Sequence, residues 1–173
     1  MKETLEVINQ MQADGIIGGY AIGGAVGATF YLEPVATLDI DVFVSFRETS
    51  DSPLISLSPL FGYLKARGYE ARGEYIVIAG WPVQFLPPGD VLGEEALAEA
   101  VETNVEGVCT RVMTAEHLVA IALQLGRVKD HARILQFVES GVMDADKLDT
   151  ILSRHGLLEK WARFGHKYLE DKQ

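Results

Sequence analysis

A chain of 173 residues suffices for one domain that buries about two-thirds of its unfolded surface without a disulfide or metal. The formal net charge of -10 argues against a protein that grips extended duplex DNA, because such proteins neutralise phosphates with a basic face. Hydrophobic residues make up 48%, yet no apolar run reaches the roughly 18 residues that a membrane span needs. A small nucleotide, a protein acceptor or a short RNA end fits this composition better.

The N-terminal segment predicts an amphipathic helix over about residues 2–13, because Leu5, Ile8 and Met11 recur at helical spacing. This segment lacks the apolar core of a signal peptide, so we expect a cytoplasmic protein. A single cysteine, Cys109, excludes an intramolecular disulfide, and its apolar neighbours predict a buried thiol.

The rest of the chain reads first as α/β and then as helical. Residues 38–46 alternate strictly between apolar and other side chains, which is typical of a strand with two different faces. The other expected elements are a strand at 20–22, a helix at 25–31, a helix at 58–67 capped by Ser58, strands at 75–79 and 82–86, a helix at 94–102, a strand at 108–113, and helices at 114–126, 129–140, 144–154 and 157–169. We therefore predict an α/β (α+β) fold, a small mixed β-sheet flanked by helices, with a core over 1–113 and a helical segment over 114–173 packed on it.

Two short motifs carry the chemistry. Gly23 and Gly24 join a strand to the start of a helix, where free backbone N–H groups bind anions and glycines let a phosphate approach closely. Asp39 and Asp41 share one face of the next strand, about 7 Å apart, and could share Mg²⁺ or Mn²⁺. Either motif alone is usually a tight turn or a solvated strand edge. Together, in this order, they favour metal-assisted nucleotidyl transfer.

The string AIGGAVGATFYLEPVATLDIDVFV resembles the signature of the DNA polymerase β-like nucleotidyltransferase superfamily, Gly-Gly or Gly-Ser followed after a gap by Asp-x-Asp. It is most similar to the small prokaryotic branch that includes AbiEii-type toxins, whose Thr-x-Asp-x-Asp arrangement matches Thr37, Asp39 and Asp41. A second segment, RVMTAEHLVAIALQLGRVKDHARI, resembles the helical part of that branch with its Arg-x-Lys-Asp motif. The likeness extends over about residues 18–138.

The resemblance implies a nucleotidyltransferase that moves an NMP group from an NTP to an unidentified acceptor, a protein or an RNA end. Asp39 and Asp41 would bind the Mg²⁺ or Mn²⁺ ions and act in catalysis. The residues implied in nucleotide binding are Gly23, Gly24, Thr37, Arg127, Lys129 and Asp130. Together with His131 and Arg133, the two basic residues of this set form the densest basic cluster of the chain. A toxin–antitoxin pair, with an antitoxin-like partner, is a further implication.

Two positions depart from the pattern of active relatives. Gln84 stands at the catalytic position where a third carboxylate is usual, and Ala122 stands where toxin-like relatives carry a lysine. A glutamine contacts a metal only weakly and cannot act as a general base. Either Asp90 or Glu74 is a candidate substitute. The sequence thus leaves open a catalytically degenerate protein that binds a nucleotide or another protein.

Two further features bear on other kinds of site. The four histidines, His117, His131, His155 and His166, never pair at the i, i+4 spacing of a helical zinc site, so no zinc site is expected. Near the C-terminus, Leu158, Trp161 and Phe164 recur at helical spacing. That stripe either packs on the domain or forms a dimer interface.

Overall fold

The computed structural model describes residues 1–34, 37, 39–46 and 56–169. Its strands are β1 (Gly19–Ile22), β2 (Ile40–Ser45), β3 (Glu70–Arg72), β4 (Tyr75–Ile78), β5 (Trp81–Leu86), β6 (Val101–Val105) and β7 (Val108–Val112). Its helices are α1 (Lys2–Ala13), α2 (Gly24–Ala28), α3 (Ser58–Ala66), α4 (Val91–Ala98), α5 (Ala115–Leu125), α6 (Val128–Ser140), α7 (Ala145–Arg154) and α8 (Leu158–Tyr168). In this described part of the chain, every helix is too short or too polar to cross a lipid bilayer.

All seven strands join one mixed sheet in the order β3-β4-β5-β2-β1-β7-β6. The central strand β2 pairs in parallel with β5 and antiparallel with β1. In these pairings Asp41 is level with Gln84 and Val42 with Ile22. The predicted mixed sheet flanked by helices is therefore confirmed. Leu38, the first residue of the predicted strand, lies outside the described residues.

The two faces of β2 look onto different surroundings. Ile40, Val42 and Val44 are buried in a hydrophobic cluster with α1 and α3. Asp41 and Phe43 point to the opposite face, since side chains alternate along a strand. On that face α2 and α4 contact β2, and both helices also contact α5. The site residues therefore lie between the sheet and the C-terminal helices.

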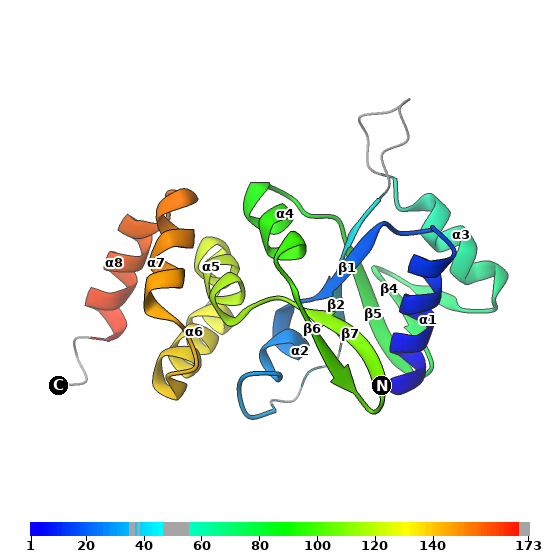
Figure 1. Ribbon diagram of the computed structural model, residues 1–173, viewed down its shortest axis with the longest axis horizontal. Helices are drawn as coiled ribbons and strands as arrows, with labels where there is room; N and C mark the ends of the chain where they lie inside the picture. The colour runs from blue at the N-terminus through cyan, green and yellow to red at the C-terminus, as the bar shows by residue number, and fades with distance from the viewer. Residues whose placement is uncertain (35–36, 38, 47–55, 170–173) are drawn as a thin grey trace.

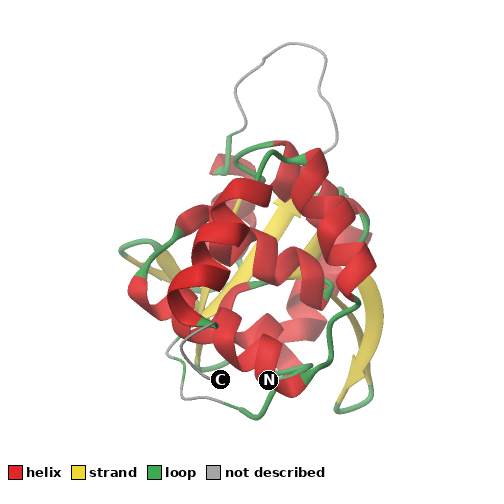
Figure 2. Ribbon diagram, turned by 90° about the vertical axis from the view of Figure 1, so that its left-hand side faces the viewer, coloured by secondary structure: helices red, strands yellow, loops and turns green. Residues whose placement is uncertain are grey.

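A second hydrophobic cluster joins α4 to the last four helices and to the inner face of the sheet. Ala21 of β1 and Met113, which directly follows β7, belong to this cluster, and Phe137 of α6 is fully buried. Figure 1 shows α5 to α8 gathered at one end of the molecule, and Figure 2 looks onto them with the strands behind. The stripe on α8 packs on this cluster through the buried Phe164, whose ring lies 5.8 Å from that of Trp161.

The segment before β7 corrects one prediction. The helix expected at 94–102 is wrong at both ends, because Asp90 caps α4 and the helix stops at Ala98. Val101 instead starts an edge strand, β6, which pairs with β7. Alternating Glu and Ala residues favour a helix locally, but pairing with β7 satisfies the backbone groups of 101–105. The sequence analysis missed β6. It also missed β3, a strand of three residues whose side chains are all exposed.

Two smaller predictions also fail. Cys109 is exposed, because alternation along β7 buries Val108 and Thr110 and turns the intervening side chain to solvent. Ser58 does not cap α3; it is the first residue of the helix, and Leu57 holds the cap position without a side-chain hydrogen bond.

Candidate functional site

The two glycines after β1 lie directly against β2. The backbone N–H of Gly23 donates to the Asp41 carbonyl at 2.9 Å. Gly24 has a φ of +58°, and a Cβ built on it would overlap the carboxylate of Asp41. A Cβ on Gly23 would lie 2.7 Å from a ring carbon of Phe43. Both positions therefore need glycine, and the reason at Gly24 is the closeness of its backbone to an acidic side chain.

Asp41 is a half-buried carboxylate with a like charge beside it. Burial, and next the negative charge of Asp39, raise the pKa of Asp41, while the positive charges of Lys129, Arg133 and Arg127 oppose this rise. The two predicted aspartates therefore lie within electrostatic reach of these three basic side chains, which come from a distant part of the sequence. A divalent cation would relieve the repulsion between the two carboxylates, and carboxylate oxygens are the donors that Mg²⁺ and Mn²⁺ prefer.

Asp39 lies just before β2 and is tied to its neighbours. The hydroxyl of Thr37 donates to the Asp39 carbonyl at 3.2 Å. Tyr75 on β4 lies near the Asp39 side chain. The negative charge of Asp39 is the largest cause of the raised pKa of Tyr75. Sequence reasoning did not single out Tyr75.

Gln84 occupies the place beside Asp41 on the neighbouring strand β5. Its amide nitrogen donates to Oε2 of Glu74 at 3.3 Å. Asp90, the other candidate substitute, has both oxygens occupied: Oδ1 accepts from the Gly93 backbone at 2.9 Å and Oδ2 from the Gln124 side chain at 2.8 Å. Glu74 therefore lies next to the site position, whereas Asp90 is held as a helix cap.

The basic cluster divides between two surroundings. Arg127, at the cap position before α6, donates to both oxygens of the buried Asp130 in the first turn, at 2.6 and 3.1 Å. This fork raises the pKa of Arg127 and fixes its side chain near Asp41. His131 faces the other way, with its ring 5.6 Å from that of Phe164. Asp130 thus holds Arg127 in place and is not itself free to bind a ligand.

A cavity of about 380 Å³ opens between the sheet and helices α4, α5 and α6. Both polar and apolar residues line it. The polar lining includes Asp41, Gln84, Asp90, Gln124, Arg127, Asp130 and Arg133, and the apolar lining includes Phe43, Leu86, Met113, Leu118, Ile121 and Leu125. Ala122 also lines the cavity. A lining that combines charged and apolar side chains suits a nucleotide, with its phosphates and base.

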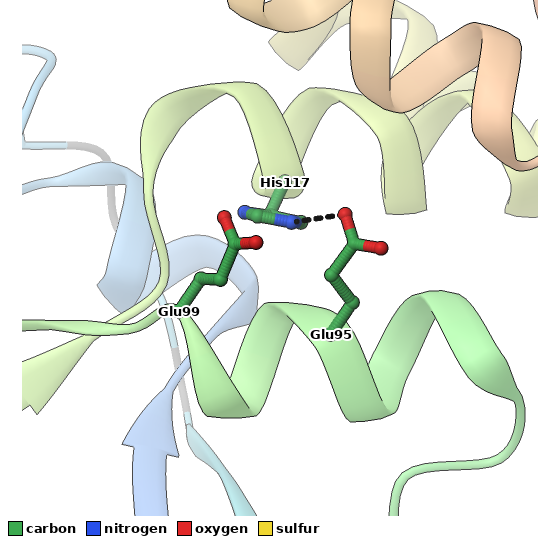
Figure 3. A group of neighbouring side chains, drawn as sticks. All are labelled: Glu95, Glu99 and His117. Atoms are coloured by element: carbon green, nitrogen blue, oxygen red, sulfur yellow. Dashed lines mark hydrogen bonds and ion pairs between the residues drawn. The ribbon is translucent and has the colours of Figure 1, made fainter.

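A second group of possible metal ligands was not anticipated. Glu95, Glu99 and His117 place ligand atoms within 4.8 Å of one another, with both carboxylates directed at the imidazole (Figure 3). The prediction against a zinc site considered spacing within one helix and so did not test a group assembled from α4 and α5. Two of these side chains already have protein partners: Glu95 accepts from Arg154 and His155, both at 2.9 Å, and the His117 ring lies 2.8 Å from the Thr114 hydroxyl.

The charge of Glu95 is well compensated. Burial alone would raise the pKa of Glu95, but hydrogen bonds from Arg154, His155 and His117 outweigh it and lower that pKa to about 2. Burial lowers the pKa of His117, whose Nδ1 lies 2.8 Å from the Thr114 hydroxyl. This group therefore ties α4 to α5 and α7 as an ion-pair network.

Comparison with solved structures shows the same fold in nucleotidyltransferases. An antigenic nucleotidyltransferase-like protein from Paracoccidioides brasiliensis superposes with a TM-score of 0.61 at 15% identity, covering 98% of this chain and 90% of that one. ANT(2")-Ia in complex with adenylyl-2"-tobramycin gives a TM-score of 0.52 at 14% identity, over 91% of this chain and 98% of that one. The solution structure of the antibiotic-resistance factor ANT(2'')-Ia gives 0.52 at 16% identity, over 98% and 97% of the two chains.

No protein-family model and no curated protein matches the chain by sequence. At these low sequence identities, the structural likeness establishes the fold. It does not establish the AbiEii-type branch to which the sequence motifs were compared. The predicted likeness to nucleotidyltransferases is thus confirmed at the level of the fold.

Proposed function

We propose that this chain is a metal-dependent nucleotidyltransferase that moves an NMP group from an NTP to an unidentified acceptor. The observation that carries the proposal is the contact of the Gly24 backbone with the Asp41 carboxylate, both of which line the cavity. Asp39 and three basic side chains lie close enough to Asp41 to affect its pKa. A carboxylate pair, a glycine turn and fixed cations are the groups that phosphoryl chemistry needs.

Each residue then has a defined task. Asp39 and Asp41 would hold Mg²⁺ or Mn²⁺, which supplies charge neutralisation of the triphosphate when bound. Gly23 and Gly24 let the phosphates approach the backbone, while Arg127, Lys129 and Arg133 balance their charge. An acceptor hydroxyl oxygen bonds to the α-phosphorus as the bond to pyrophosphate breaks, and pyrophosphate leaves. Positioning and electrostatics account for catalysis, with no covalent intermediate on the protein.

The alternative is a nucleotide- or protein-binding module without turnover. One observation favours it: Gln84, and not a carboxylate, is level with Asp41. The implied toxin of a toxin–antitoxin pair, with a protein antitoxin, remains an untested prediction of the resemblance. Among the similar structures, the complex with adenylyl-2"-tobramycin adds a small-molecule acceptor to those worth testing.

Pyrophosphate release separates the two readings. The protein is incubated with each of four α-labelled NTPs and Mg²⁺, in the presence of tobramycin, short RNA ends or fractionated protein. The proposal expects label on one acceptor class, pyrophosphate in equal amount, and neither product with the Asp39→Asn/Asp41→Asn variant. Mg²⁺-dependent binding of a nucleotide with no release above that of the variant, in every fraction, would favour the binding module.

A further inference from the structure

We propose that Glu74, in the turn between β3 and β4, supplies the third carboxylate of the site in place of Gln84 on β5. This inference rests on the proposed function, since it names a further residue of the same site. It explains how a chain with glutamine at the usual position keeps the rest of the arrangement. The carboxylate would have moved from one strand to the adjoining hairpin.

The path from Glu74 to Asp41 is short. Strands β4 and β5 are antiparallel, with Ile76 opposite Val83, so the residues just before Ile76 lie beside Gln84. Glu74 sits in the tight turn that precedes β4, and its Oε2 accepts from the Gln84 amide at 3.3 Å. On its other side Gln84 is level with Asp41 in the parallel pairing of β5 with β2. Gln84 therefore contacts Glu74 and is also the residue of β5 that is level with Asp41.

Tyr75 provides a second link between the hairpin and the aspartates. The negative charges of Asp39, Glu74 and Asp41 all raise the pKa of Tyr75, that of Asp39 most strongly. All three carboxylates therefore lie within electrostatic reach of one tyrosine side chain. Asp90 lines the same cavity but serves as the cap of α4 and accepts from Gln124, so it is not available for this role.

The chemistry of the pair is complementary. The Gln84 amide holds Oε2 of Glu74, which directs the carboxylate and leaves Oε1 for a cation or for the proton of an acceptor hydroxyl. A carboxylate can accept that proton, whereas an amide cannot. When the hydroxyl oxygen bonds to the α-phosphorus, its proton would pass to Glu74 and the electron pair of the broken bond would leave with pyrophosphate. Gln84 then acts as a positioning residue.

The test measures Mn²⁺ affinity with and without ATP, from the free Mn²⁺ signal in electron paramagnetic resonance. Four variants are compared with the wild type: Glu74→Gln, Gln84→Asp, the double variant carrying both, and Glu70→Gln as a control. Glu70 is an exposed glutamate on β3 of the same hairpin, paired with Val77 and away from Gln84. Urea unfolding of each variant checks that the fold is unchanged.

We expect Glu74→Gln to weaken Mn²⁺ binding in the presence of ATP by roughly tenfold or more, as loss of a metal-site side chain does. The double variant should regain most of this affinity, because Gln84→Asp puts a carboxylate back beside Asp41. Glu70→Gln should bind as the wild type does. Pyrophosphate release, where an acceptor is known, should fall and recover in the same order.

Other outcomes overturn the inference. Wild-type affinity in Glu74→Gln would show that Glu74 contributes nothing to the site. A loss that Gln84→Asp does not restore would show that Glu74 does not stand in for the position on β5. Failure of the proposed function itself is seen separately in the wild type, which would then either bind no Mn²⁺ and no nucleotide, or bind both and release no pyrophosphate with any acceptor.

Discussion

Replacing Gly24 with alanine tests the closest contact in the site. The residue has a φ of +58°, a conformation that costs an alanine roughly 1–2 kcal/mol. Its new Cβ would also overlap the carboxylate of Asp41, and overpacking of this kind costs about 1–3 kcal/mol more. We therefore expect Gly24→Ala to lower the free energy of unfolding by about 2–5 kcal/mol and to displace the Asp41 side chain.

A matched control isolates the collision from the backbone cost. Gly141 ends α6 with a φ of +66°, and a Cβ there would meet nothing within 4 Å. Gly141→Ala should therefore cost only the backbone part, roughly 1–2 kcal/mol. Both variants are unfolded in urea and followed by tryptophan fluorescence, and Mg²⁺-dependent ATP binding is measured by calorimetry. Equal losses of stability in the two variants, with ATP affinity unchanged in Gly24→Ala, would refute the contact between Gly24 and Asp41.

Three further predictions concern the groups around the site. In Asp130→Asn, Arg127 loses its bidentate carboxylate partner. We expect this variant to have a free energy of unfolding lower by about 1–3 kcal/mol and to bind ATP more weakly. An unchanged urea unfolding curve would contradict this. The pKa of the Glu95 carboxylate is lowered from 4.5 in the unfolded chain to about 2 in the folded protein, so its charged form stabilises the fold fully at pH values above 4.5. That stability is lost as pH falls from 4.5 toward 2. The pKa shift corresponds to about 3 kcal/mol, which solvent screening reduces to about 1–2 kcal/mol. In Glu95→Gln, the Tm measured by thermal melts should therefore depend less on pH over this window. The buried His117, with a lowered pKa, binds fewer protons folded than unfolded, so stability should fall as pH drops below 6.5, and His117→Gln should remove this slope.

Helices and strands with a strong hydrophobic periodicity were predictable from the sequence. Elements whose conformation depends on pairing with another strand were not. The strict alternation in β2 and the helical spacing in α1 each follow from one buried face, which the residues themselves display. β6 has no such signal, because its side chains are mostly exposed and its place comes from pairing with β7. Local composition there favours a helix, and the tertiary partner overrides it. Cys109 shows the same limit, since alternation along β7 and not its apolar neighbours decides its exposure.

The candidate site divides in a similar way. The antiparallel pairing of β1 with β2 brings together two motifs that are near in sequence, Gly23-Gly24 and Asp39-x-Asp41. The burial of Asp130 under Arg127 and the contact of Glu74 with Gln84 depend on side-chain directions that no spacing reveals. The group of Glu95, His117 and His155 comes from three helices, so its assembly requires the packed structure.

Calorimetric titration of ATP, GTP, CTP and UTP, with and without Mg²⁺, tests the central claim most directly. The wild type is compared with the Asp39→Asn/Asp41→Asn variant, whose urea unfolding is measured alongside it. A site built on these two carboxylates predicts that at least one nucleotide binds only with Mg²⁺, and that the variant folds but loses this binding. Binding of no nucleotide by the wild type, or equal Mg²⁺-dependent binding by the folded variant, would contradict it.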